Sequence, residues 1–362
     1  YPKTNHRLSP FPLQQASLLH VQDWGVGRPS AHLWAPRRGA FPLPPVVYRL
    51  FKVRGGRDGL PRGNMPSTSY HMDERELMGE RMKVAISGQD DFVQPYLESA
   101  LGDNLVQIPH EMLQEKLQLD VLLTSCDAVV LMNAHPPQTG AGRDDREALL
   151  AMRDSARPIL EAVERHGSLH LVLIGTLRVH PQPTPEDPYY SSQVSLVPRD
   201  IAAEGQLWVE ERAIEHATED SPVSVLRCSN VQGVRLDSDE GNGILHQFAR
   251  DAIFGWVSVP GDGTQVKDFV HISDVLEVVM HILQNPPPTR ETLCIGTGEG
   301  SVMSDVAAIY QQRAGCDPQF GNDDSHEVWG VVDAWEIEQR CGFRPSVTPA
   351  EMIDEAFENA GI

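Results

Sequence analysis

The chain lacks several features that identify common protein classes. Its five cysteines (Cys126, Cys228, Cys294, Cys316 and Cys341) are widely spaced, and no two form a C-x-x-C pair. This pattern argues against a disulfide frame or a cysteine zinc site and is typical of thiols in a reducing compartment. No apolar run approaches the roughly 18 residues that a membrane span needs. The sequence therefore predicts a soluble protein with no metal site and no membrane partner.

Basic residues are also scarce. The chain has 30 Lys and Arg against 51 Asp and Glu, a net charge of −21. Residues 1–81 hold 12 basic and 6 acidic side chains, whereas residues 82–362 hold 18 and 45, with only three lysines. This acid excess argues against nucleic acid or anionic membranes as partners. The charge division indicates that two different kinds of sequence are joined near residue 82.

Residues 1–81 are rich in Pro and Gly, with 10 and 8 of them, and show no helical or strand period. Such a composition buries too little apolar surface to offset chain entropy, so we expect disorder. Three interpretations remain open: an organelle transit peptide, a flexible tail, or an over-long reading of a protein that starts at Met82. The expected location is the cytoplasm, or an organelle matrix if the segment is a transit peptide.

Residues 82–362 alternate between short apolar runs and helical patterns. Strands are predicted at 83–87, 104–108, 127–132, 169–174 and 223–226, of which 127–132 and 169–174 are expected to be buried. Helices are predicted at 92–101, 145–166, 201–216, 245–253, 274–285 and 304–313. This alternation predicts an α/β fold with a doubly wound parallel, Rossmann-type sheet. We expect the Rossmann part over about 82–230 plus returning segments, and a smaller C-terminal α/β substrate lobe from the remainder.

Four segments of the second half follow a known order. They are R-C-S-N-V-Q-G at 227–233, the block 260–275 (PGDGTQVKDFVHISDV), C-I-G-T-G at 294–298 and G-F-R-P at 342–345. In this order they resemble the extended short-chain dehydrogenase/reductase family, the NAD-dependent epimerases and dehydratases of nucleotide sugars. The resemblance covers essentially all of residues 82–362. It implies NAD(P) as cofactor, a nucleotide sugar as small-molecule ligand, and a possible homodimer.

The cofactor loop departs from the family pattern. The family has G-x-x-G-x-x-G after the first strand, whereas this chain keeps only Gly88 and has Asp91 and Gln94 at the other two positions. Adjacent carboxylates at Asp90 and Asp91 would repel a pyrophosphate. The segment 106–109 (VQIP) offers neither the acid nor the arginine expected at the adenosine ribose. We therefore expect NAD(P) binding in the usual manner to be impaired, with Gly88 as the remaining cofactor-binding candidate.

The catalytic pair departs as well. The resemblance places Thr176 at the family's Ser/Thr position, which makes it the catalytic candidate, although a Thr ending a strand is ordinary. The family's Tyr would follow some 25 residues later, yet no Tyr-x-x-x-Lys occurs in the chain. Tyr189 and Tyr190 are too close to Thr176 in sequence to replace it.

Asn230 and Lys267 are the predicted substrate-binding residues. The resemblance places Lys267 where a basic residue meets a nucleotide-sugar diphosphate, although a surface charge is the simpler reading. We expect His271 to hold the segment from Asp268 to Asp274 in place. A further hypothesis is that Arg178, His180 and Glu204 form an unusual acid/base set.

The missing motifs favour a catalytically impaired member of the family that acts as a small-ligand-binding or regulatory protein. The alternative is an active NAD(P)-dependent oxidoreductase, epimerase or dehydratase on a nucleotide sugar, with a rewritten active site. A structural subunit of a larger assembly is a third class that the sequence leaves open.

Overall fold

The computed structural model describes residues 82–88, 92–132, 145–184, 186–236, 238, 240–321 and 329–362, without the side chains of 145–148 and 329. The expectations for residues 1–81, and for Asp90 and Asp91, lie outside this part of the chain. Among the described residues, no helix has the length and apolar character needed to cross a bilayer.

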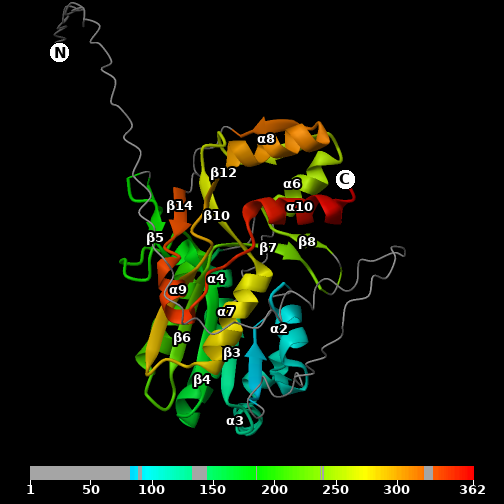
Figure 1. Cartoon of the computed structure of the whole chain (residues 1–362). Coiled ribbons are helices and arrows are strands. Elements are labelled where there is room, and N and C mark those ends of the chain that lie inside the picture. The colour runs from blue at the N-terminus through cyan, green and yellow to red at the C-terminus, as the bar shows by residue number, and fades with distance from the viewer. Residues whose placement is uncertain are drawn as a thin grey trace, which may run out of the picture. The chain divides into compact units, whose positions relative to one another are not determined.

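The largest sheet of the described residues has six strands, in the order β11-β6-β4-β3-β1-β2 (Figure 1). Every neighbouring pair in it is parallel. Its strands are β1 (Val84–Ser87), β2 (Leu105–Gln107), β3 (Ala128–Met132), β4 (His170–Thr176), β6 (Val223–Cys228) and β11 (Arg290–Ile295). All residues of β1, β3 and β6 are buried, because helices cover both faces of the sheet. The predicted doubly wound Rossmann-type fold is confirmed.

Two apolar clusters lie on opposite faces of this sheet. One packs it against α2 (Gln94–Leu101), α7 (Ile272–Gln284) and α9 (Trp335–Cys341). The other packs it against α3 (Lys116–Leu123), α4 (Asp145–His166) and α5 (Ile201–Glu215). Short 3₁₀ helices connect these elements: η2 (Gly102–Asn104), η3 (His110–Gln114) and η4 (Leu177–Val179).

A second sheet has the order β5-β14-β10-β7-β8, and β12 pairs with β10 outside that path. Its strands are β5 (Tyr189–Tyr190), β7 (Asn230–Val234), β8 (Gly241–Asn242), β10 (Val266–His271), β12 (Gly300–Val302) and β14 (Trp329–Val332). The pair β9 (Trp256–Val259) and β13 (Asp317–Phe320) lies beside α6 (Ile244–Ala252) and α8 (Met303–Ala314). Together with α10 (Pro349–Ala360), these elements share a third apolar cluster and form the C-terminal lobe (Figure 1).

The predicted helices begin and end within two residues of the observed ones, and α4 continues through Pro158. Helix α3 was not predicted. In α3 the apolar residues Leu117 and Val121 face solvent, with 80% and 74% of their surfaces exposed. Apolar residues therefore lie on more than one face of the helix, and the sequence lacks the single apolar stripe that indicates a surface helix.

Candidate functional site

In doubly wound folds, ligands bind at the carboxyl ends of the parallel strands. Gly88 directly follows β1 and Thr176 ends β4, with β3 between these strands in the sheet. Asn230 begins β7 and Lys267 lies on β10, which are neighbours in the second sheet. The predicted residues therefore form two pairs, one on each sheet. Their roles in binding and catalysis stay predictions.

The backbone requires glycine at position 88. Gly88 has a φ of +99°, and a Cβ atom there would lie 1.8 Å from the carbonyl oxygen of Met132. The end of β3 therefore packs directly against the turn after β1. Gly88 stands at the end of β1, where a dinucleotide-binding fold places its pyrophosphate.

The end of β2 carries a polar group that sequence reasoning missed. The Gln94 amide donates a hydrogen bond of 2.8 Å to Oε1 of Glu98, and the Gln107 amide donates to the same oxygen. Glu98 of α2 therefore brings a carboxylate to the end of β2, although the strand itself offers none. In dinucleotide-binding folds the adenosine ribose lies at the end of this strand, where a carboxylate would serve as a hydrogen-bond acceptor. Gln94 remains a departure from the family loop.

Helix α5, where the resemblance places the family's Tyr and Lys, contains neither residue over Ile201–Glu215. A Cβ atom at Gly205 would lie 2.9 Å from the Met152 sulfur of α4, so the two helices touch there. The Thr176 hydroxyl accepts a hydrogen bond of 3.3 Å from the backbone N–H of Arg178. Thr176 thus also caps η4.

A buried polar network lies between α5 and the sheet. Nε and Nη2 of Arg227 donate to Glu210 at 3.0 and 2.8 Å, and Gln206 donates to the other oxygen of Glu210 at 3.1 Å. Nη1 of Arg227 lies 3.2 Å from Nε2 of His180, and the Cys294 sulfur lies 3.7 Å from the same nitrogen. Burial raises the pKa of Cys294 to about 12, so this thiol is not a nucleophile.

The structure gives the three residues of the acid/base hypothesis separate partners and does not support their acting as one set. His180 is fully buried, and burial together with Arg227 and Arg199 lowers its pKa to about 3. Arg178 forms an ion pair with Asp200. Glu204 lies 3.8 Å from Arg153 of α4.

Asn230 and Lys267 lie close together on neighbouring strands. The Asn230 amide donates a hydrogen bond of 2.9 Å to the backbone oxygen of Asp268, the residue after Lys267. Lys267 is half-buried and has no ion-pair partner among the described residues. Burial, and then the charge of Arg199, lower its pKa. The site therefore has a partly desolvated cation without a counter-ion in the described part of the chain.

Two residues of the block 260–275 hold the lobe together. The buried Asp268 carboxylate accepts hydrogen bonds from the N–H and hydroxyl groups of Thr297 and from the N–H groups of Gly298 and Val332, at 2.8 to 2.9 Å. Nδ1 of His271 accepts from the N–H of Ser273 and caps α7. The predicted structural role of His271 is confirmed, whereas Asp268 was not singled out. The sequence feature that could have identified Asp268 is its position between Lys267 and the apolar run 269–270.

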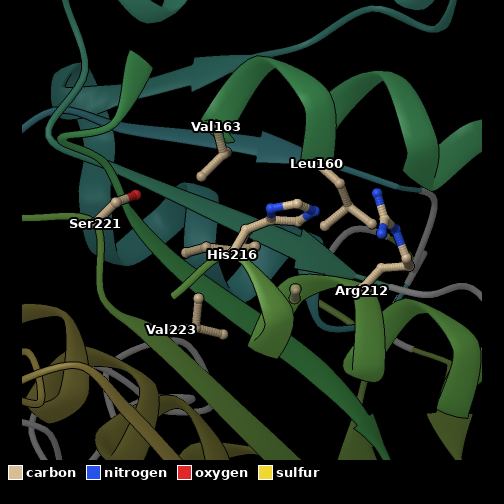
Figure 2. Close-up of a pocket in the computed structure, with 8 residues that line it drawn as sticks. Leu160, Val163, Arg212, His216, Ser221 and Val223 are labelled. Carbon is tan, nitrogen blue, oxygen red and sulfur yellow. The ribbon is translucent and has the colours of Figure 1, made fainter. Parts of the chain in front are cut away.

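A small pocket lies at the opposite end of the sheet. Figure 2 shows it between α4, α5 and the strands. Its lining residues are Leu160, Val163, Leu171, Arg212, Ala213, His216, Ser221 and Val223. Leu171 and Val223 stand near the amino ends of β4 and β6, so this pocket is separate from the site at the carboxyl ends.

The chain is similar to proteins of known activity. It is 22% identical over 220 residues to a UDP-N-acetyl-alpha-D-glucosaminuronate decarboxylase of Bacillus cytotoxicus, which covers 57% of this chain and 67% of that protein. Its fold matches MoeE5 in complex with UDP-glucuronic acid and NAD, with a TM-score of 0.65, 20% identity and coverage of 77% and 99%. It also matches the UDP-glucuronic acid 4-epimerase from Bacillus cereus, with a TM-score of 0.64, 20% identity and the same coverage.

The family comparison matches more than half of the chain. Residues 106–296 fit the NAD dependent epimerase/dehydratase family. This span runs from β2 to the loop after β11 and includes Thr176, Asn230 and Lys267. The chain belongs to the NAD dependent epimerase/dehydratase family.

Proposed function

We propose that this protein is an NAD(P)-dependent enzyme that acts on a nucleotide sugar, as an oxidoreductase, epimerase or dehydratase with a rewritten active site. The observation that carries the proposal is the half-buried Lys267, which has no counter-ion among the described residues. A cation in such a place is unfavourable unless an anion compensates its lost hydration. A nucleotide-sugar diphosphate supplies that anion, and Asn230 on the next strand offers an amide oxygen for hydrogen bonding.

The cofactor would bind at the carboxyl end of β1. Gly88, which has no side chain, would let the backbone approach a pyrophosphate, and the Glu98 carboxylate would accept hydrogen bonds from ribose hydroxyls. When bound, NAD(P) would supply the acceptor for a hydride from the sugar. We propose a small-molecule partner of this kind rather than a polyanion, because the net charge of −21 repels nucleic acid.

The chain's own residues define what the active site can do. The Thr176 hydroxyl lies at the end of β4, where it can orient a sugar hydroxyl by a hydrogen bond. Helix α5 contains no tyrosine or lysine that could move a proton, and the fully buried His180 does not reach a substrate. Proton transfer must therefore use a group outside the family pair.

A second candidate is binding of the nucleotide sugar without conversion. The sequence of α5 favours it, because residues 201–215 contain neither the tyrosine nor the lysine that the family uses. In that case the protein is a small-ligand-binding or regulatory member of its family.

One experiment separates the two candidates. UDP-glucose, UDP-glucuronic acid and dTDP-glucose are titrated by calorimetry with and without NAD⁺ or NADP⁺, and the mixtures are then analysed by chromatography. Binding followed by the formation of a new nucleotide sugar supports the enzyme. Binding without formation of any product supports the second candidate. If no nucleotide sugar binds, both are wrong.

A matched pair of variants tests the site. Lys267→Met should weaken nucleotide-sugar binding by roughly tenfold or more, since hydrogen bonds to charged groups contribute about 1.5–3 kcal/mol. Lys116→Met removes an exposed lysine of α3 and should leave binding unchanged. Equal affinities for the two variants would contradict the assignment of Lys267.

A further inference from the structure

A glycine on β14, which has no side chain, leaves room for an aromatic ring beside Lys267. Lys267 of β10 is paired in register with Gly330 of β14, so both residues point to the same face of the sheet. A Cβ atom at Gly330 would lie 2.4 Å from the Tyr190 ring, which therefore occupies the space over the glycine. Tyr190 thus lies next to Lys267 on this face.

Arg199 stacks on the same ring. The guanidinium carbon of Arg199 lies 5.6 Å from the centroid of the Tyr190 ring. Nη2 of Arg199 donates to the Leu177 backbone oxygen at 3.1 Å, and its backbone N–H donates to the Arg178 oxygen at 3.1 Å. Arg199 is therefore anchored to η4, directly after Thr176. The charge of Arg199 also lowers the pKa of Lys267, as expected for two neighbouring cations.

Arg199 has no carboxylate partner among the described residues, and its Nε is buried without an acceptor. The nearest acidic residue in the chain, Asp200, is paired with Arg178. Glu336 accepts hydrogen bonds from Ser191 and Ser192. Residues 82–362 hold 45 acidic side chains, yet the described ones leave both cations uncompensated.

We infer that Arg199 is a specificity-determining residue that binds a carboxylate on the sugar, so that the preferred ligand is a nucleotide uronate. This inference rests on the proposed function, which assigns the diphosphate to Lys267. The two cations then meet the two anionic groups of one ligand. Arg199 is the one that lies beside Thr176, at the end of β4 where the reacting sugar would be oriented.

The chemistry of the two side chains suits this division. A lysine ammonium is a compact point charge that suits a phosphate oxygen, whereas a guanidinium is a planar set of donors that matches a carboxylate. The stacking on Tyr190 and the bond to Leu177 limit the rotation of the guanidinium. A carboxylate therefore meets donors that are already oriented, which lowers the entropic cost of binding.

The test compares two ligands that differ at one carbon of the sugar, UDP-glucuronic acid and UDP-glucose. Calorimetry with NAD⁺ present should show that the wild type binds the uronate roughly tenfold or more tightly. Arg199→Gln should abolish this preference while changing the affinity for UDP-glucose by less than about threefold. Arg199→Lys should retain part of the preference, because it keeps the charge but loses the planar donors.

Two further variants distinguish the possible failures. Lys267→Met should weaken the binding of both ligands alike. Arg212→Gln, which removes a partly exposed arginine of α5, should change neither affinity. If Arg199→Gln weakens both ligands equally, Arg199 belongs to the diphosphate site and the inference is wrong. If the wild type binds both ligands equally well, the inference fails while the proposed function stands. If neither ligand binds, the proposed function fails with it.

Discussion

Arg227 of β6 and Glu210 of α5 form an ion pair in which Nε and Nη2 both donate to one carboxylate oxygen, at 3.0 and 2.8 Å. Both side chains are almost fully buried, at 4% and 1% exposure. The pair fastens the helix that begins at Ile201 to the central sheet. It therefore holds the middle of α5 against β6.

Removing one partner should destabilise the protein strongly. Glu210→Ala leaves the Arg227 charge buried without compensation, which costs about 3–5 kcal/mol. Chemical denaturation followed by circular dichroism measures this loss. The control is Arg212→Ala, which breaks the exposed pair with Glu215 on the same helix and should cost less than about 1 kcal/mol. Similar losses for both variants would contradict the buried role of Glu210.

Replacing Gly88 should destabilise the turn after β1. In Gly88→Ala the new Cβ would collide with the Met132 oxygen, and the φ of +99° is unfavourable for alanine. We expect a loss of more than about 2 kcal/mol in unfolding free energy. Gly102→Ala is the matched control, because Gly102 has a φ of +51° but nothing within 4 Å of a Cβ atom. Its expected loss is about 1 kcal/mol. A smaller loss of unfolding free energy for Gly88→Ala than for Gly102→Ala would contradict this prediction, because it would mean that the end of β3 moves to accommodate the new Cβ atom.

The Asp268 carboxylate should be required for the C-terminal lobe. Asp268→Asn replaces one carboxylate oxygen, which accepts hydrogen bonds, by an NH2 group, which donates them. The buried N–H groups that face this position then lose their acceptor. We expect a loss of about 2 kcal/mol or more, measured as the change in thermal unfolding. Asp305→Asn, at an exposed position in the first turn of α8, should cost less than about 1 kcal/mol. An unaffected Asp268→Asn protein would contradict this account of the lobe.

The stability of the protein should fall in mild acid because of His180. Burial, and then Arg227 and Arg199, lower its pKa from 6.5 to about 3 in the folded protein. The unfolded chain therefore binds a proton that the folded chain excludes. The stabilisation is fully present above pH 6.5 and is lost as the pH falls toward 3. Urea unfolding at several pH values should show a steeper acid loss for the wild type than for His180→Gln. The exposed His110→Gln should follow the wild type, and a His180→Gln curve that matches it too would contradict the prediction.

Apolar patterning predicted most of the Rossmann part because the burial that it produces is local. The predicted run 127–132 contains β3, whose residues Ala128–Met132 are all buried, and the pattern over 145–166 is the helix α4. Helix α3 escaped prediction because Leu117 and Val121 face solvent. Helix α5 was predicted, but the burial of Glu210 within it was not, because its partner Arg227 follows 17 residues later on β6.

The sequence by itself determined the parallel α/β fold, the family blocks after residue 227, and the absence of a Tyr-x-x-x-Lys pair. These depend on spacing along the chain, which the sequence contains directly. Only the tertiary structure decided which charges compensate one another. Arg178 pairs with Asp200 and Glu204 with Arg153. Arg199, which stacks on Tyr190, and Lys267 on β10 have no acid as partner among the described residues. Electrostatic interactions depend on the distance between charged groups and on how deeply they are buried. Both quantities depend on which residues, often far apart in the chain, the fold brings together.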